Sequence, residues 1–549
     1  MTMLQPQFTS EAPSSLSLSL SLSLSLSLSL SLSLSLSLPP SMDLMIALQS
    51  LLFILLFVYV CLYLQQPQQT NGFSVYPILG TAPEFIKNYH RYLEWTTDVL
   101  RRCPTNTSVF RHPTTIHGVL TANPANVEHV LKSNFLNYPK GDEFRYILHD
   151  FLGRGIFNSD GDLWKIQRKT ASFKFNKRSM RNFVSNIVAV EITTRLIPVL
   201  RKASETDRVL DLQDTLERFA FDNVCMIAFK VNPGCLGEGD GAVVGGEFIR
   251  AFENAAAISL GRFMHAFQFV WKIKKFFNVG SERRLKESIK TIHEFADKVV
   301  DLRLSKRNAD DEDDLLSHFV GMHGENLNSS KEFLRDVIVS FILAGRDTTS
   351  SALTWFFFLV STTPNVERKI LQELETVRVR LGKRVGDTYD FEALQEMNYL
   401  QAALSEAMRL YPPVPTDTKV CQNDDVLPDG TFVAKGWFMT YSAYAMGRME
   451  SIWGEDCGEF RPERWLDEGG MWRQPASPFR FPVFHGGPRI CLGREMAYLQ
   501  MKCIAACVIE GFKMHVEGMD KNGKRPGYSL SLTLRMKGGL PMRVSQRCG

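Results

Sequence analysis

The loop around Cys491 has the residue types of a ligand-binding site. Residues 484–493 read Phe-His-Gly-Gly-Pro-Arg-Ile-Cys-Leu-Gly. The two glycines and the proline before the cysteine predict a tight loop whose backbone can approach a flat ligand closely. Arg489 can pair with an acidic group of that ligand. Gly493 stands where a helix is expected to begin, and a helix N-terminus helps to hold a thiolate. The loop can thus present Cys491 to a ligand, and the alternative at this point is a structural buried cysteine.

A second segment could move protons. Residues 344–349 read Ala-Gly-Arg-Asp-Thr-Thr within a helix expected from Asp336 to Val360. Glycine inside a helix costs roughly 1 kcal/mol relative to alanine, so Gly345 predicts a close approach of a planar cofactor or of O₂. A threonine there can divert a backbone carbonyl and open a groove for water. An acid beside an alcohol, here Asp347 and Thr348, can then relay protons, and the alternative at this point is a helix surface with ordinary polar residues.

Together these segments resemble the cytochrome P-450 superfamily, whose haem loop has the spacing F-x-x-G-x-R-x-C-x-G. The resemblance runs from about residue 73 to the C-terminal region. It implies a mainly α fold with small β-sheets and haem b with Cys491 as the axial thiolate, which favours O–O cleavage. It also implies that O₂ is used, with NADPH-derived electrons delivered by cytochrome P-450 reductase. The haem-binding loop residues carried over are Phe484, Gly487, Arg489, Cys491 and Gly493.

Other motifs of the superfamily match residues further from the loop. Glu406 and Arg409 share a helix face at i, i+3, and Arg464 lies in the sequence Phe-Arg-Pro-Glu-Arg-Trp. The resemblance implies that these three lock the fold behind the haem loop. Trp164 and Arg168, at i, i+4, resemble the pair that holds a haem propionate. The basic residues expected to face the reductase are Lys165, Lys169 and Arg494.

The elements that must position these residues are mostly helical. Helices are expected at 336–360, 391–410 and 493–509, and short strands near 109–120, 431–440 and 528–544. The length of 549 residues would allow roughly three domains, but the motifs converge on one cofactor and predict one catalytic domain, 67–549. The net charge of +4 is too small at this length to indicate a nucleic acid partner.

The N-terminal 41 residues do not have the pattern of a folded element. Residues 15–38 repeat Ser-Leu, which spreads leucine around a helix and gives a strand one long unpartnered apolar face. A CT dinucleotide repeat encodes Leu and Ser alternately, so we expect translation to begin at Met42. The alternative is a translated but disordered leader, residues 1–41. Mass spectrometry that detects peptides from before Met42 would exclude the first interpretation.

The next segment has the length of a membrane anchor. Leu44 to Leu64 is 21 residues without a charge, enough to span a bilayer, and we place the transmembrane anchor at 42–66. Basic residues follow it, beginning at Lys87, which favours a cytosolic body, and ten cysteines suit a reducing compartment. We expect a single-pass protein of the endoplasmic reticulum membrane. The alternative is a cleaved signal peptide.

Four segments narrow the resemblance to one plant branch. They are 153–158, 344–351, 427–431 and 444–449. The branch contains fatty-acid ω-hydroxylases, jasmonoyl-amino-acid oxidases and steroid side-chain terminal hydroxylases. The resemblance implies oxidation at the end of an aliphatic chain. A fatty acid is the first choice of substrate, a sterol side chain in steroid or saponin biosynthesis the second, and a jasmonoyl conjugate the third.

The acid–alcohol pair separates the classes of function within the superfamily. Hydroperoxide isomerases typically lack the pair, and a haem sensor has no need of it, so Asp347 and Thr348 favour a monooxygenase. Terminal attack has to be enforced by a narrow channel. The channel walls are expected at Phe144–Phe157, at the aromatic residues Phe263, Phe267, Phe269 and Trp271, at Pro413–Thr416 and at Ser531–Leu534. Core packing or membrane contact is an equal interpretation of the aromatic run.

Overall fold

The computed structural model describes residues 47–55, 57–58, 68–70, 72–76, 79–112, 117–237, 240–265, 267–305, 314–321, 331–518 and 525–547. The chain divides into two units, Met1–Gln68 and Gln69–Gly549. In the first unit, residues 47–55 and 57–58 are helical, and their large apolar side chains are exposed. The Ser-Leu leader, Met42 and the rest of the predicted anchor lie outside the described residues.

The second unit is mainly helical. Its α-helices are α3 (Ala82–Lys87), α4 (Tyr92–Arg102), α5 (Pro124–Glu128), α6 (Asp142–Leu152), α7 (Gly161–Ser172), α8 (Lys177–Phe183), α9 (Ala189–Glu191), α10 (Ile197–Glu205), α11 (Leu212–Phe229), α12 (Asp240–Met264), α13 (Phe269–Phe277), α14 (Gly280–Ser305), α15 (Leu315–Gly321), α16 (Lys331–Ile342), α17 (Thr348–Ser361), α18 (Pro364–Arg380), α19 (Phe391–Glu396), α20 (Asn398–Leu410), α21 (Ala443–Met446), α22 (Glu450–Trp453) and α23 (Arg494–Gly511).

Short turns of other helical types connect these helices. The π-turns are η3 (His129–Ser133), η6 (Val184–Val188), η7 (Ile192–Leu196) and η8 (Leu343–Asp347). The 3₁₀ turns are η2 (Tyr89–Arg91), η4 (Phe135–Asn137), η5 (Ile156–Asn158), η9 (Pro462–Trp465), η10 (Pro482–Phe484) and η11 (Gly487–Arg489). The haem-loop sequence is therefore built from two 3₁₀ turns that lead into α23.

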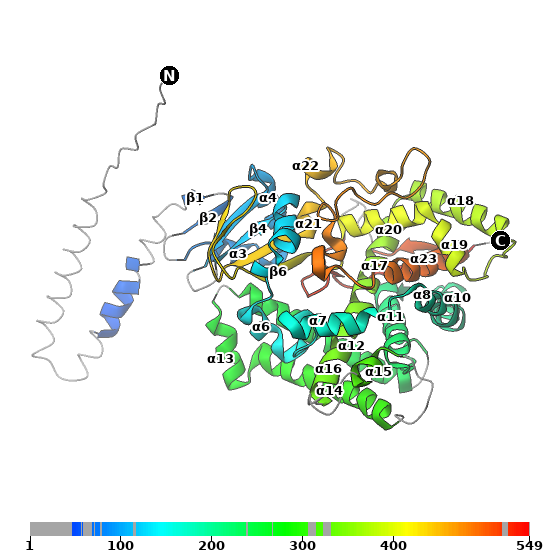
Figure 1. Ribbon diagram of the computed structural model, residues 1–549, viewed down its shortest axis with the longest axis horizontal. Helices are drawn as coiled ribbons and strands as arrows, with labels where there is room; N and C mark the ends of the chain where they lie inside the picture. Colours follow the sequence, from blue (N-terminus) through cyan, green and yellow to red (C-terminus); the bar gives the residue numbers. More distant parts are fainter. Residues whose placement is uncertain are drawn as a thin grey trace, which may run out of the picture. The chain divides into compact units, whose positions relative to one another are not determined.

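The strands form small sheets. They are β1 (Gln68–Thr70), β2 (Phe73–Val75), β3 (Thr107–Arg111), β4 (His117–Thr121), β5 (Leu210–Asp211), β6 (Thr416–Val420), β7 (Asp425–Val426), β8 (Phe432–Val433), β9 (Phe438–Ser442), β10 (Phe512–Val516), β11 (Tyr528–Ser529), β12 (Arg535–Met536) and β13 (Pro541–Gln546). The largest sheet has the order β3-β4-β9-β6, with β4 parallel to β9 and the other neighbours antiparallel. In Figure 1, β4 and β6 lie beside α3 and α4, on the opposite side of the body from α18 and α23.

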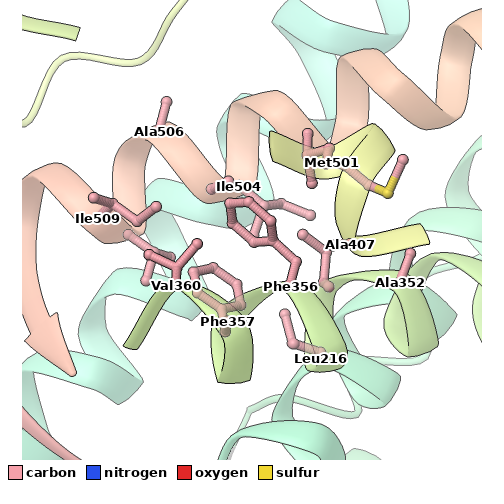
Figure 2. Close-up of a cluster of buried hydrophobic side chains, with 14 of the residues drawn as sticks. Leu216, Ala352, Phe356, Phe357, Val360, Ala407, Met501, Ile504, Ala506 and Ile509 are labelled. Atoms are coloured by element: carbon pink, nitrogen blue, oxygen red, sulfur yellow. The ribbon is translucent and has the colours of Figure 1, made fainter. Parts of the chain in front are cut away.

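The core is densest where α17 meets α20 and α23. Figure 2 shows Phe356 and Phe357 of α17 close to Ile504 of α23, with Ala407 of α20 beside them. Both phenylalanines are fully buried, and burying one such side chain stabilises a fold by roughly 1.5–3 kcal/mol. Every residue of α17 from Thr349 to Val360 is buried, so it is a central helix of the core.

The structure confirms the predicted fold class and alters some element boundaries. The helix predicted over 391–410 is interrupted at Met397, between α19 and α20. The cause is a cap from a distant helix, because the Glu373 carboxylate of α18 accepts the backbone N–H of Tyr399 at 2.6 Å and of Leu400 at 2.8 Å. These N–H groups at the start of α20 would otherwise be unpaired. A sequence pattern does not contain this long-range partner.

Within the described residues, one helical run is long and apolar enough to cross a membrane. It is Lys177–Glu205, which comprises α8 to α10 with their π-turns. Val184, Val188 and Ile192 on this run are fully buried in the main core. We therefore interpret the run as a core helix.

Candidate haem and substrate site

A cavity of about 520 Å³ opens at Cys491. This is a normal size for a ligand pocket. Thr348 of α17 lines the same cavity, so the cysteine loop and the acid–alcohol segment face one space. Most of the other lining side chains are aliphatic or aromatic. The predicted site residues that line it are Trp164, Arg168, Thr348, Phe484, Arg489, Cys491 and Gly493, whereas Asp347 and Gly487 are not among the described residues of its wall.

The cysteine loop is held by its own backbone and by a distant π-turn. The N–H of Cys491 donates to the Phe484 carbonyl at 2.9 Å, and the N–H of Ile490 donates to the Gly487 carbonyl at 3.1 Å. Gly487 has φ +61°, and a Cβ there would lie 1.9 Å from the carbonyl oxygen of Leu131 in η3. Close packing of the loop against η3 therefore requires a glycine at this position. The approach of a flat ligand to the loop backbone stays a prediction.

The groups around Cys491 shift the pKa of its thiol in opposite directions. Burial raises the pKa of the Cys491 thiol, while the Gly493 N–H and the charges of Arg168 and Arg494 lower it. The Gly493 N–H therefore acts in the direction predicted for a helix N-terminus. Burial is the largest of these contributions, and a coordinated metal ion would favour the thiolate, because it deprotonates a ligating thiol.

Cationic side chains surround the cysteine end of the cavity. Arg489 donates to Asp160 at 2.6 Å and to the Ser159 carbonyl at 3.0 Å, and its guanidinium carbon lies 4.3 Å from the centre of the Trp164 ring. Its Nε is buried without a hydrogen-bonding partner. Arg168 lies near enough to Cys491 for the two charges to interact. Trp164, Arg168 and Arg489 thus meet at one corner, as predicted.

Sequence reasoning missed two lysines, Lys140 and Lys419, that also line the cavity. Lys140 donates to Asp417 at 2.7 Å, and Lys419, which is almost fully buried, donates to the same carboxylate at 2.6 Å. His485 faces Asp417 as well, at 3.2 Å. The lysines meet because the N–H of Val420 at the end of β6 donates to the Pro139 carbonyl at 2.9 Å. The one local signal in the sequence was Lys419, a lysine shortly after the helix that carries Glu406 and Arg409.

The residues present fit haem b. The cations that line the cavity are Lys140, Arg168, Lys174, Lys419 and Arg489, and Asp417 is the carboxylate among its described lining residues. This excess of positive charge suits the two propionates of haem b. Arg489, whose guanidinium lies over the Trp164 ring, is one of these cations. The apolar lining and the open side of Cys491 suit the macrocycle and its iron.

The helix opposite Cys491 changes its winding at the acid–alcohol segment. Residues 343–347 form the π-turn η8 between α16 and α17, and Thr348 Oγ1 donates to the Ala344 carbonyl at 2.6 Å. This is the predicted diversion of a backbone carbonyl by threonine. Gly345 lines the cavity, so the expected approach of a planar cofactor or of O₂ stays a prediction. Packing gives a second reason for the glycine, because an added Cβ would lie 2.6 Å from a Val224 methyl group of α11. The glycine lets α11 pack closely against this helix.

Asp347 belongs to a buried charge network. Arg346, 1% exposed, donates to Asp347 at 2.6 Å and to Glu217 of α11 at 3.2 Å, and lies 3.5 Å from Glu253 of α12. Arg535 of β12 completes the network, 2.7 Å from Glu217 and 2.8 Å from Glu253. Burial raises the pKa of Asp347 to about 6, although Arg346 opposes the shift. Burial and the neighbouring Glu253 also raise the pKa of Glu217, against Arg346 and Arg535. Three carboxyl groups share two guanidinium groups, so this network can hold a proton near neutral pH.

The predicted structural lock comes together around Glu406. Arg409 binds its carboxylate through two hydrogen bonds of 2.8 Å, and Trp465 donates to it at 2.8 Å. Arg464 donates at 3.3 Å. Arg409 also donates to the carbonyls of Cys457 at 2.7 Å and Glu459 at 2.9 Å. The cluster joins α20 to the segment that precedes the haem loop, and Glu406 and Arg409 are both fully buried.

We expect Glu406→Ala to destabilise the fold by about 3–5 kcal/mol, because it leaves Arg409 buried and unpaired. Equilibrium unfolding in urea and the haem content of the purified protein measure the effect. Glu392→Ala removes an exposed ion pair with Arg181 and should change stability by less than about 0.5 kcal/mol. Equal stability of the two variants would contradict the lock.

Some of the predicted channel-wall residues line the cavity, and others lie in the core or at the surface. Side chains from 144–157, all of Pro413–Thr416, and Ser531 to Thr533 line the cavity. Leu534 instead lies in the core. Of the aromatic run, Phe263 lines the cavity, Trp271 is fully buried, and Phe269 is exposed. The run therefore includes a pocket residue, a core residue and a surface residue.

The chain belongs to the cytochrome P450 family, whose model matches residues 71–538. It is therefore a haem-thiolate monooxygenase that uses O₂ and NADPH-derived electrons, with an axial cysteine thiolate. Similar proteins carry CYP94 names. Cytochrome P450 CYP94D108 of Paris polyphylla is 54% identical over 468 residues, 85% of this chain and 91% of that protein. Cytochrome P450 94B1 of Arabidopsis thaliana is 45% identical, over 86% of this chain and 91% of that protein. Cytochrome P450 94A1 of Vicia sativa is 44% identical, over 86% and 90%. These relatives support the predicted branch of fatty-acid ω-hydroxylases and jasmonoyl-amino-acid oxidases.

Proposed function

We propose that this protein hydroxylates the terminal (ω) carbon of an aliphatic chain of a lipid. The balanced reaction converts R–CH₃, O₂, two electrons and two protons to R–CH₂OH and water. Bound haem supplies the activation of O₂ and the insertion of one oxygen atom. The observation that carries the proposal is the apolar cavity shared by Cys491 and Thr348, walled by Phe144, Leu148 and Val414 among other apolar side chains.

The chain's own residues would position the substrate and move protons. Cys491 is proposed as the iron ligand, with Trp164, Arg168, Phe484, Gly487, Arg489 and Gly493 as the haem-binding residues. Thr348 faces the cavity and Asp347 lies behind it in the charge network. A proton at the Asp347 carboxyl can reach the Thr348 hydroxyl when either group reorients or a water joins them. We propose this pair as the source of the protons in the balanced reaction.

The substrate test compares three lipids in one assay. Microsomes that contain the protein and cytochrome P-450 reductase are given lauric acid, a hydroxycholesterol or jasmonoyl-isoleucine, with NADPH. We expect a terminally hydroxylated product from at least one of them, with a fatty acid first and a sterol side chain second. Turnover that needs a hydroperoxide instead of NADPH, or oxidation away from the chain end in all three, would refute the proposal.

We also propose that the body contacts the membrane independently of the anchor at 42–66. The apolar residues Phe269, Ile273, Phe276 and Phe277 follow helical spacing on α13 and are exposed, Phe276 by 83%. Lys272, Lys274 and Lys275 flank this face. An amphipathic helix with lysines beside aromatic residues is typical of a membrane interface. This supports the proposed single-pass protein of the endoplasmic reticulum with a cytosolic catalytic domain.

Brominated lipids can detect the contact of α13. In proteoliposomes of the full chain, Phe276→Trp should add fluorescence that brominated lipids quench, because this position is expected to lie among the acyl chains. Val379→Trp, at an exposed apolar position of α18, is the matched control and should add fluorescence that is quenched less. Equal quenching at the two positions would contradict the membrane contact.

For the reductase we propose a docking face formed by Lys165, Lys169 and Arg494. Lys165 and Lys169 are exposed on α7, the helix that also carries Trp164 and Arg168. Arg494 begins α23, directly after the haem loop. A basic surface at this position can attract an acidic electron donor and speed its association.

A further inference from the structure

The end of α6 and the residues after it border two cavities. Leu148, Leu152 and Ile156 line the substrate cavity. His149 and Gly153, which alternate with them along the chain, line a second cavity of about 630 Å³. Protein interiors are normally close-packed, and on the side of the second cavity this wall is not backed by close-packed side chains. Other contacts must therefore hold the wall in place.

Two helices hold the backbone of this wall at Arg154. The Arg154 N–H donates to the Asp336 carboxyl group of α16 at 2.8 Å. The Arg154 carbonyl accepts from the side-chain amide of Gln167 of α7 at 3.0 Å, and Gln167 is almost fully buried. Asn158 donates to the Gly153 carbonyl at 2.9 Å from within the same segment. Hydrogen bonds to α16 and α7 therefore fix the position of the segment 153–158.

Two glycines let the segment lie directly on α16. Gly153 has φ +49°, and a Cβ there would collide with the Asp336 carboxyl group. A Cβ at Gly155 would lie 2.8 Å from the Asp336 carbonyl oxygen and would also collide with the Ser340 hydroxyl group. Asp336 thus meets the segment through both its side chain and its backbone, and the sequence of the segment is adapted to this contact.

The same contact places the wall near the acid–alcohol segment. Ser340 lies about one helical turn before Ala344, and the Ala344 carbonyl accepts the Thr348 hydroxyl group. Ala344 and Thr348 line the substrate cavity together with Ile156, which directly follows Gly155. The wall that Asp336 holds therefore belongs to the same part of the cavity as the groups proposed to move protons.

We propose that Asp336 is a positioning residue that decides which carbon of the aliphatic chain is oxidised. Asp336 is not among the described residues of the substrate cavity, so it acts through Ile156 and Phe157, which line it. A displacement of about 1 Å in a bound geometry can change a rate 10²-fold, and neighbouring carbons of an alkyl chain differ in position by little more than this. The inference rests on the proposed terminal hydroxylation and names a residue that enforces it.

The ratio of two products measures the position of attack. Microsomes with the full chain, reductase and NADPH are given dodecanoate, and the products hydroxylated at the terminal and at the penultimate carbon are separated. We expect Asp336→Ala to lower the terminal-to-penultimate ratio about five- to tenfold, the effect of one lost hydrogen bond. Total turnover per haem should change much less. Asp336→Asn keeps an oxygen that accepts the Arg154 N–H and should recover most of the wild-type ratio.

A second variant tests the same wall from the other helix. Gln167→Leu removes the donor to the Arg154 carbonyl and leaves α16 unchanged. It should shift the product ratio in the same direction as Asp336→Ala. The control is Glu332→Ala, because Glu332 lies one turn earlier on α16 and lines the second cavity but is not among the described residues of the substrate cavity. This control should keep the wild-type ratio.

The outcomes separate this inference from the proposed function. An unchanged product ratio in Asp336→Ala, or a loss of haem protein and of both products in equal measure, would overturn the role of Asp336. A wild-type protein that oxidises mainly another carbon would contradict terminal hydroxylation. In that case a changed product distribution in Asp336→Ala would still support the positioning role, because the distribution can be measured for any major product.

Discussion

Replacing Cys491 with alanine is expected to abolish both the Soret band that names the family and NADPH-supported turnover. The side chain faces the cavity, and the loop holds it there through the hydrogen bond from Cys491 N–H to the Phe484 carbonyl. The backbone bond survives the substitution, so the loop keeps its shape while the axial thiolate is lost. The difference spectrum of the reduced protein with carbon monoxide measures the first effect, and product formation measures the second.

The matched control is Cys507→Ala. Cys507 lies on α23, is partly buried and packs against the main core rather than lining the cavity. This variant should keep the band and most of the turnover, with only the modest loss of stability that follows from removing a small core side chain. A Soret band that survives in Cys491→Ala would show that another group binds the iron.

Asp347→Asn is expected to reduce turnover by about 10²-fold or more, the scale of a lost general acid–base group. NADPH consumption should fall less than product formation, because electrons still arrive while protons are delivered poorly. The pH dependence gives a second test. With its pKa raised to about 6, the wild-type carboxyl stays protonated below that pH. Wild-type turnover should therefore decline above about pH 6, where the carboxyl is ionised and carries no proton to deliver, and the Asn variant should lack this limb.

A thermal unfolding measurement can show that the loss of turnover in Asp347→Asn comes from the chemistry and not from unfolding. The folded carboxyl has a pKa near 6 and the unfolded one a pKa near 4, so the folded state binds more protons between these values. Stability therefore falls as pH rises through this window, and the ionised Asp347 costs stability at pH 7. Asp347→Asn removes that cost and should unfold at a temperature no lower than the wild type at neutral pH. Asp301→Asn, at an exposed ion pair with Lys331, is the control for turnover. Full turnover in Asp347→Asn would exclude the carboxyl as the relay.

The sequence predicts the parts of the site that are local in the chain. The haem loop, the pair Glu406 and Arg409, and the threonine that diverts a carbonyl each lie within one turn or one short motif, so their spacing already indicates their geometry. The family comparison confirms the fold class, the haem and the monooxygenase class. The assigned residue roles, the leader, the anchor and the substrate stay predictions.

What sequence reasoning missed depends on tertiary contacts. The close contacts of Gly345 and Gly487 are with Val224 and Leu131, which are distant in sequence, so the sequence could not show this packing reason for the two glycines. The two lysines that meet at Asp417 come from segments that are distant in sequence, one before α6 and one on β6. The pairing of Arg489 with an acidic group of the ligand stays a prediction, and the sequence could not show that Asp160 of the chain occupies part of its donor set.

The π-turn η8 also fixes the rotation of α16 relative to α17 about their common axis. An α-helix advances about 100° per residue, and a π-turn accommodates an extra residue in one turn. Deleting one residue within 343–347 would restore regular winding but rotate α16 by about 100° relative to α17. Val337 and Ile338 on α16, now fully buried against α11 and α14, would then turn away from their partners. The irregular turn that precedes Thr348 therefore keeps the buried faces of both α16 and α17 against their partners. The number of residues in this turn is fixed for the same reason.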